Sequence, residues 1–173
     1  MVEKIIKGIK YRLDEETMTA EVIAKRNGYE GDIIIPETVV SNRASYLVTS
    51  IGKNTFFDCK SLTFITLPDS IKSIGFGAFM SCESVSKSTL PDSVKSIESY
   101  AFFGCGSLTE ITISNSVKSL GHNAFSNCIS LEAITYNGTR EKWKKVKKDT
   151  LSDKWITGIL AKFVQCTDGL VKI

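Results

Sequence analysis

The sequence predicts a solenoid, with a parallel β-sheet on its concave side and short helical or irregular turns on its convex side. Three observations predict this fold. The phrase IGFGAFMSC at residues 74–82 has three close relatives in the chain, and the four terminal cysteines (59, 82, 105 and 128) stand 23 residues apart. Each unit opens with alternating apolar and polar residues, the pattern of a short strand. Because one unit cannot bury its own apolar face, the units must stack.

Length and composition place the chain among ordinary globular proteins. It has 173 residues, of which 42% are hydrophobic and 24% charged, enough to bury a core without disulfide staples. No apolar stretch approaches the length that spans a bilayer, and charges at residues 3, 4, 7 and 10 occupy the place where a signal peptide needs an apolar run. We therefore expect no membrane insertion and no signal peptide in this sequence.

The strands of the solenoid follow from aligning the units on their cysteines. Full units occupy residues 62–84, 85–107 and 108–130, and another unit opens at residue 131. Alternation turns the isoleucines and leucines of each strand inward and the intervening side chains outward, onto the concave side. The predicted parallel strands are 32–36, 62–67, 85–90, 108–113 and 131–136. One outward column consists of Thr66, Thr89, Thr112 and Thr135, and the next of Phe64, Lys87, Glu110 and Ala133.

The second half of each unit supplies turns and more of the core. A P-D-S or S-N-S turn follows the strand, and apolar residues then re-enter the interior. An aromatic column closes the unit on the convex side, at Phe56, Phe79, Phe102 and Phe125. We expect these four rings to stack as a buried spine.

The repeat L-x-x-I-x-I-P-x-x-V-x-x-I-G-x-x-A-F-x-x-C resembles that of the BspA-like family of leucine-rich repeats, which occur in surface and secreted proteins of bacteria and some protozoa. The resemblance extends to YRLDEETMTAEVIA and GDIIIPETV near the start and to YNGTREKWKKV and VQCTDGLV near the end. It implies a leucine-rich repeat solenoid, a cell-surface or extracellular location, and adhesion to host or extracellular-matrix proteins.

Three departures from the repeat are expected to disturb it locally. Ser88 stands where an inward isoleucine belongs, and a buried hydroxyl needs a hydrogen-bond partner. Glu98 replaces the usual glycine. Nine extra residues between Pro36 and Ile51, relative to the six-residue step from Pro68 to Ile74, predict an expanded loop or extra hairpin at 41–48.

Both ends of the solenoid need caps, because a stack exposes its terminal units. We expect a single domain: a hairpin cap at 1–30, repeats at 31–139, and a helical cap with a final strand at 140–173. In the hairpin cap, Ile9, Tyr11 and Leu13 alternate, DEET turns, and MTAEVIA returns. A helix is predicted from an N-cap at Thr139, with Trp143, Val146 and Leu151 on one stripe. The final strand, KFVQC, precedes an Asp168–Gly169 turn.

The sequence gives no support for an enzyme or a metal site. The repeated cysteines lie in a row, one strand spacing apart, instead of converging as zinc ligands must, so we expect them and Cys166 to be reduced, buried packing residues. His122, the one histidine, has no positioned carboxylate or nucleophile in the repeat and is expected to lie solvated in its turn. Neither a phosphate-binding glycine loop nor paired carboxylates occur, and no cofactor is implied.

Positive charge gathers at the C-terminal end of the chain. Residues 137–173 carry 9 basic and 4 acidic side chains, whereas residues 1–136 carry 13 and 15. The lysines around Trp143 suggest nucleic acid or an anionic membrane surface. A helix that buries its tryptophan and solvates its lysines is favoured instead, because no other basic stripe extends these lysines across the chain.

The sequence therefore predicts a non-enzymatic interaction or adhesion module, monomeric, that presents its concave sheet or the 41–48 loop to a protein or glycan partner. The concave columns are favoured because the convex columns are committed to packing and the ends to caps, so that only the concave columns vary in chemistry from unit to unit. A structural spacer or stalk is the alternative, and binding of an anionic surface through the basic cap is a weaker one. The candidate binding residues are Phe64, Thr66, Lys87, Thr89, Glu110, Thr112 and Thr135.

Overall fold

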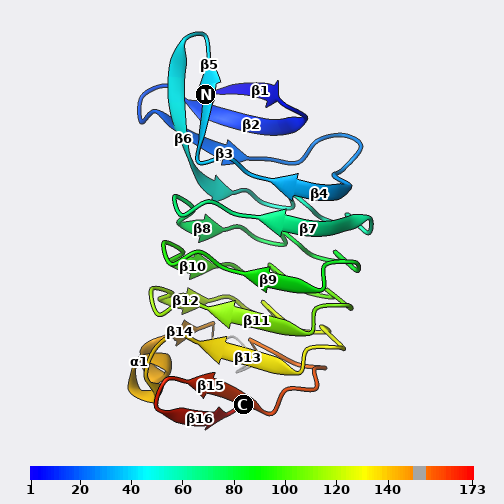
Figure 1. The fold of residues 1–173 in the computed structure, drawn as a ribbon, viewed down its shortest axis with the longest axis vertical. Helices are drawn as coiled ribbons and strands as arrows, with labels where there is room; N and C mark the ends of the chain where they lie inside the picture. The colour runs from blue at the N-terminus through cyan, green and yellow to red at the C-terminus, as the bar shows by residue number, and fades with distance from the viewer. Residues whose placement is uncertain (150–154) are drawn as a thin grey trace.

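The structure, a computed structural model that describes residues 1–149 and 155–173, is a stack of similar turns of chain (Figure 1). Each 23-residue unit forms one rung of this stack, with a strand on one side and a second, shorter strand on the other. The strands on the long-strand side are β4 (Gly31–Ile34), β7 (Leu62–Thr66), β9 (Lys87–Thr89), β11 (Glu110–Ile113), β13 (Ala133–Tyr136), β15 (Phe163–Cys166) and β16 (Gly169–Lys172). The other side holds β1 (Val2–Ile6), β2 (Ile9–Asp14), β3 (Thr19–Val22), β5 (Thr38–Ser41), β6 (Ala44–Ile51), β8 (Ser73–Ile74), β10 (Ser96–Ile97), β12 (Ser119–Leu120) and β14 (Lys147–Lys148).

The five predicted parallel strands are confirmed as β4, β7, β9, β11 and β13. β4 pairs with β7, and β9, β11, β13 and β15 pair in series, all in parallel. The ladder is interrupted between β7 and β9, which belong to different sheets. The interruption falls at the unit where Ser88 replaces isoleucine. Ser88 still points inward and is buried, and no fully buried side-chain nitrogen or oxygen in the described part of the chain lacks a hydrogen-bond partner.

A second sheet on the opposite side was not predicted from the sequence. Nine strands form it, in the order β1-β2-β3-β6-β8-β10-β12-β14, with β5 paired to β6. In β8, β10 and β12 the strand is a single Ser-Ile or Ser-Leu pair that matches the next rung in parallel. A two-residue strand is too short to show alternation, so the sequence marked only its inward isoleucine or leucine as a core position.

The aromatic spine is confirmed. Adjacent rings of the four phenylalanines stack with centroids 5.0, 4.9 and 5.2 Å apart and interplanar angles of 7°, 12° and 9°. At the N-terminal end, Tyr29 tilts against Phe56 at 4.8 Å, and at the C-terminal end Trp155 meets Phe125 edge-on at 6.2 Å. All six side chains are buried. The spine is therefore a continuous aromatic column that both caps extend.

The cysteines lie beside this spine and pack as predicted. All five are buried, with free thiols. The thiols of Cys82, Cys105 and Cys128 donate hydrogen bonds of 3.0–3.1 Å to the carbonyls of Phe56, Phe79 and Phe102, each in the preceding unit. Burial raises the pKa of Cys82 to about 12. The thiol thus ties each rung to the one before it.

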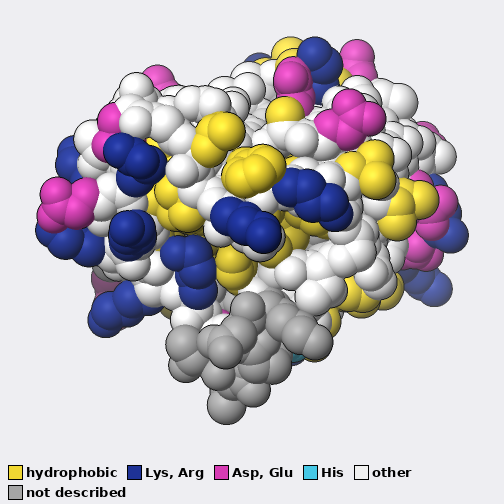
Figure 2. Space-filling model, turned by 90° about the horizontal axis from the view of Figure 1, so that it is seen from below, with side chains coloured by type: hydrophobic (Ala, Val, Ile, Leu, Met, Phe, Trp, Pro, Cys, Tyr) yellow, Lys and Arg dark blue, Asp and Glu magenta, His cyan; other side chains and the backbone are white. Residues whose placement is uncertain are grey.

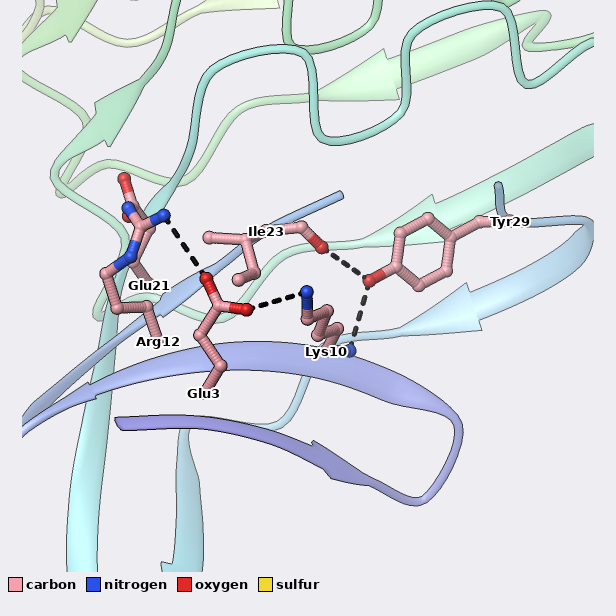
Figure 3. Close-up of polar contacts among 6 residues, drawn as sticks. All are labelled: Glu3, Lys10, Arg12, Glu21, Ile23 and Tyr29. Atoms are coloured by element: carbon pink, nitrogen blue, oxygen red, sulfur yellow. Dashed lines mark hydrogen bonds and ion pairs between the residues drawn. The ribbon is translucent and has the colours of Figure 1, made fainter. Parts of the chain in front are cut away.

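The N-terminal cap contains the predicted antiparallel pair, β2 and β3, and an unpredicted edge strand, β1, that pairs with β2. Figure 3 shows how Glu3 of β1 contacts two basic side chains of β2: it accepts from Lys10 at 2.7 Å and lies 3.6 Å from the Arg12 guanidinium. Arg12 also donates to Glu21 of β3 at 2.7 Å. The hydroxyl of Tyr29 donates to the Ile23 carbonyl at 2.7 Å. The cap thereby fixes the ring that covers the aromatic spine.

The nine extra residues after Pro36 form a hairpin, as one of the two predicted alternatives had it. β5 and β6 pair antiparallel, from Thr38 with Leu47 to Ser41 with Ala44. The two turn residues, Asn42 and Arg43, both have positive φ, 50° and 67°, the geometry of a type I′ turn. The hairpin projects from the N-terminal end of the stack (Figure 1).

The C-terminal cap contains the predicted helix and final strand, although the helix is shorter than expected. Helix α1 (Arg140–Lys145) has Thr139 as its N-cap and buries Trp143. Val146 ends the helix in an extended conformation, because the next two residues form β14 and pair with β12. Leu151 of the predicted stripe lies outside the described residues. β15 and β16 form a hairpin in which Cys166 pairs with Gly169, so the turn residues are Thr167 and Asp168, one residue earlier than predicted.

Candidate interaction surface

The outward side of β4, β7, β9, β11 and β13, here called the strand face, carries the predicted binding residues. In its outermost column, Glu110 lies beside Lys87 on one side and Ala133 on the other. The Lys87 ammonium and the Glu110 carboxylate are 2.8 Å apart, with side chains 68% and 53% exposed. Phe64 is 51% exposed. The column thus presents an aromatic ring followed by an ion pair, all accessible to a partner.

The threonine column is continuous in register wherever strands pair. Thr112 lies between Thr89 and Thr135. Ile34 precedes the column beside Thr66, and Gln165 follows it beside Thr135. Both of these neighbours were missed from the sequence. Ile34 is 70% exposed. It lies in a run of three isoleucines, in which inward and outward positions cannot be told apart by residue type. A register shift between Gly31 and Asp32 also changes which residue of β7 lies beside it.

A shallow pocket of about 250 Å³ lies on the strand face where the ladder is interrupted. It brings together four of the predicted residues. Thr112 and Thr135 lie outside it, and Glu110 reaches it only through its ion pair with Lys87. The lining residues are Phe64, Ile65, Thr66, Leu67, Asp69, Lys87, Thr89 and Pro91.

Variable exposed side chains are not confined to the strand face, and that premise of the sequence interpretation is wrong. On the turns that connect each short strand to the next long strand, here called the opposite turns, the Phe57 side chain is 49% exposed and the Phe76 side chain 37%. The Phe76 ring lies 5.5 Å from that of Tyr100, which in turn meets His122 edge-on at 5.5 Å. His122 is half-buried and within 2.9 Å of the Asn123 amide, so it is more tightly packed than the solvated histidine expected.

The expectation that no basic stripe extends the C-terminal lysines is also wrong. Lys72, Lys95 and Lys118 occupy the same position in three successive units, just before β8, β10 and β12. The backbone amides of Lys95 and Lys118 donate to the carbonyls of Lys72 and Lys95, each at 2.8 Å. This backbone ladder continues into β14, where the Lys147 amide donates to the Lys118 carbonyl at 2.9 Å. The signal was visible in the repeated VKS and IKS, but the placement of Lys147 depends on the short strand β14, where Lys147 pairs with Ser119 and so lies one position further along than Lys118.

Two further properties bear on the class of function. Among the described residues, no group of three or more histidine, cysteine, aspartate or glutamate side chains is placed to hold a metal ion. No helix in the described part of the chain is both long and apolar enough to cross a membrane.

Comparison with known proteins identifies the repeat. A family model described as "BspA type Leucine rich repeat region" matches residues 37–157 in six copies. No curated protein sequence matches the chain.

Solved structures agree with this family. A leucine-rich cell surface protein from Faecalibacterium prausnitzii is 26% identical with a TM-score of 0.65, over 86% of this chain and 43% of its own. A leucine-rich repeat protein from T. pallidum is 25% identical with a TM-score of 0.71, over 91% and 65%. A leucine-rich repeat protein from Bacteroides ovatus is 26% identical with a TM-score of 0.62, over 93% and 46%. This chain thus spans about half to two thirds of these structures.

Proposed function

Because the chain belongs to the BspA-type leucine-rich repeat family, we propose that it is a non-enzymatic interaction module whose strand face binds a protein or glycan partner at the cell surface. The location rests on the similar F. prausnitzii structure, which is described as a leucine rich cell surface protein. The observation that carries the binding site is the pocket beside Phe64, where an exposed ring adjoins an exposed ion pair. Aromatic side chains near polar groups are typical of binding hot spots.

The interrupted ladder between β7 and β9 supports this placement. Elsewhere on the strand face, the paired strands place Thr89, Thr112 and Thr135 side by side. At the interruption the surface is hollowed between Phe64 on one rung and Lys87 on the next. A partner side chain can enter this hollow and lose contact with water there, which a flat surface does not offer. Phe64 and Lys87 are therefore the residues expected to contribute most.

The proposal is tested with a triple variant, Phe64→Ala/Lys87→Gln/Glu110→Gln. The chain offers a matched control in Phe57→Ala/Lys60→Gln/Glu83→Gln on the opposite turns. These residues have the same chemistry and similar exposure: Phe57 is 49% exposed, and Lys60 and Glu83 form an ion pair of 3.2 Å with side chains 58% and 55% exposed. Both variants should unfold in urea at the wild-type midpoint, because neither removes a buried group.

Binding is measured by surface plasmon resonance against a panel of immobilised extracellular-matrix proteins and a glycan array. We expect the strand-face variant to lose binding by roughly tenfold or more, the loss typical when hot-spot side chains are truncated. The control variant should bind as the wild type does. Equal loss in both variants, or loss in the control alone, would move the site to the turns. Absence of binding to any member of both panels would favour the structural spacer.

A further inference from the structure

The lysines of the second sheet lie on a different side of the molecule from the strand face and form a continuous basic surface. We define the lysine column as Lys72, Lys95 and Lys118, which hold the same position in successive units, together with Lys147, which pairs with Ser119 and lies one position further along its strand. Their backbones are linked rung to rung by hydrogen bonds of 2.8–2.9 Å, and all four side chains are exposed. Neighbouring strands are about 4.8 Å apart, so the column runs for about 14 Å along the stack.

At its C-terminal end the column opens into a hollow of about 500 Å³ beside helix α1. Four lysines line this hollow, and none of the described acidic side chains does. The lining residues are Asn115, Val117, Lys118, Ser119, Tyr136, Lys142, Lys145, Val146 and Lys147. Lys and Arg side chains gather on this side of the C-terminal end, where α1 and β14 lie (Figure 2).

Most of these ammonium groups have no anionic partner within the described part of the chain. Lys145 pairs with Glu141 at 2.7 Å, whereas Lys118, Lys142 and Lys147 make no ion pair with a described residue. Lys148 next to them has a different role: its ammonium lies 4.5 Å from the centre of the Trp143 ring and donates to two carbonyls of the cap. Lys148 packs on the cap, while its neighbours leave their charge available.

From this arrangement we infer a second binding site, distinct from the strand face, for a linear sulfated polysaccharide that lies along the lysine column and ends in the hollow beside α1. The lysines recur along one line, so a chain that carries repeated anionic groups can contact several at once, whereas a single small anion cannot. Lysine offers compact, rotatable point charges, which suit sulfate groups that vary in position along a flexible chain.

The lining of the hollow beside α1 favours a polysaccharide over other polyanions. Single-stranded nucleic acids bind through aromatic side chains on which bases stack, but Tyr136, the one aromatic residue of the hollow, is buried against Trp143. Membrane surfaces are bound by exposed apolar side chains placed among the cations. None of the exposed large hydrophobic residues of the described chain lines this hollow.

The test uses the full chain and a heparin-derived dodecasaccharide, with binding followed by fluorescence anisotropy from about 50 to about 300 mM NaCl. The variant is Lys95→Gln/Lys118→Gln/Lys147→Gln, and the matched control is Lys4→Gln/Lys162→Gln/Lys172→Gln, exposed lysines with the same change in net charge. We expect the column variant to bind roughly tenfold or more weakly, and its slope of log K against log [NaCl] to fall by about one per lysine. The control should stay within about twofold of the wild type.

Several outcomes would overturn the inference. If the control variant loses as much affinity as the column variant, net charge alone explains binding. If a single-stranded DNA of equal charge, or vesicles with anionic lipid, bind as tightly as the dodecasaccharide and respond to the same lysines, the ligand class is wrong. The strand-face variant Phe64→Ala/Lys87→Gln/Glu110→Gln keeps the lysine column intact and should retain dodecasaccharide binding. Its failure to do so would place the polysaccharide on the strand face.

Discussion

Single residues hold this protein together through repetition, since the same side chain meets its own equivalent one rung away. Phe79 is the central example. Its buried ring stacks between Phe56 and Phe102 at 5.0 and 4.9 Å, and its carbonyl accepts the thiol of Cys105. Loss of one such residue therefore removes contacts from three units at once.

Replacement of Phe79 by alanine should lower the free energy of unfolding by about 3–5 kcal/mol, because it leaves a cavity in the middle of the stacked rings. Urea unfolding followed by circular dichroism measures the change. Phe57→Ala serves as the control, since this neighbour of Phe56 is 49% exposed and should cost no more than about 0.5 kcal/mol. Similar losses for the two variants would show that the spine does not carry the stability assigned to it.

The buried thiol of Cys82 should make stability depend on alkaline pH. Burial raises its pKa in the folded state from 9.0 to about 12. The unfolded chain therefore releases this proton at lower pH than the folded chain does, and the contribution of the thiol to stability, complete below pH 9, is lost as pH rises towards 12. Between about pH 9 and about pH 12, the free energy of unfolding of reduced protein should fall less steeply in Cys82→Ala than in the wild type. Parallel pH profiles would contradict this assignment.

At the scale of elements, the strands that show alternation over several residues were predictable, and the shortest ones were not. The pattern of Ile111, Thr112 and Ile113 identifies β11 directly. β8, β10 and β12 have two residues each, which is too few for a period to appear. β14 comes directly after helix α1, and Lys147 and Lys148 fit a continuation of the helical pattern as well as they fit a strand. These strands form because neighbouring rungs offer them backbone partners, a tertiary condition that local sequence does not contain.

The candidate sites were likewise predictable only in part: their residues could be placed from the sequence, but the hollows that they line could not. Alternation alone placed Phe64, Lys87 and Glu110 in one outward column. The pocket beside Phe64 depends on the interruption between β7 and β9, and the hollow beside α1 depends on where β14 ends the helix. Both follow from how rungs meet, which the sequence marks only indirectly, through Ser88 in one case and repeated lysines in the other.

The β5–β6 hairpin offers a test of its turn. Arg43 has a φ of 67°, a conformation that costs an ordinary residue about 1–2 kcal/mol and glycine almost nothing. Arg43→Gly should therefore raise the free energy of unfolding by up to about 1 kcal/mol, after the greater flexibility of glycine in the unfolded chain is allowed for. Thermal unfolding measures this, with Arg43→Val, which tolerates positive φ poorly, expected to shift the midpoint in the opposite direction. A stabilising valine would rule out the type I′ turn.

Across the whole molecule, the turn after the short strand brings neighbouring rungs into close backbone approach where that position is a glycine, as at Gly75 and Gly121. A Cβ atom at Gly121 would collide with the backbone of Glu98 and Ser99, 2.5 Å from the Glu98 carbonyl carbon. The preceding unit carries Glu98 at the equivalent position, and its carboxylate accepts a hydrogen bond from the Phe76 amide at 2.9 Å. The Glu98 side chain, which replaces the usual glycine, thus links its own rung to the preceding one.

Gly121→Ala should lower the free energy of unfolding by about 1–3 kcal/mol, the usual effect of overpacking, because the rungs must separate to admit the methyl group. Gly106→Ala is the matched control, since a Cβ there would meet nothing within 4 Å. Chemical unfolding of both variants provides the comparison. If the two alanines cost the same, close approach at Gly121 does not determine how the rungs stack.

The rings at the two ends of the aromatic spine also determine how the length of such a protein can change. Tyr29 packs on the ring of the first unit and Trp155 on that of the last, while every interior phenylalanine meets only its own kind. A tandem copy of residues 85–107 would offer both of its neighbours the ring and carbonyl that they already contact, and would lengthen the stack by about 4.8 Å. The caps thus determine where the aromatic column ends but not how many units it contains. Whole units can therefore be inserted or deleted without changing the contacts that each interior phenylalanine makes.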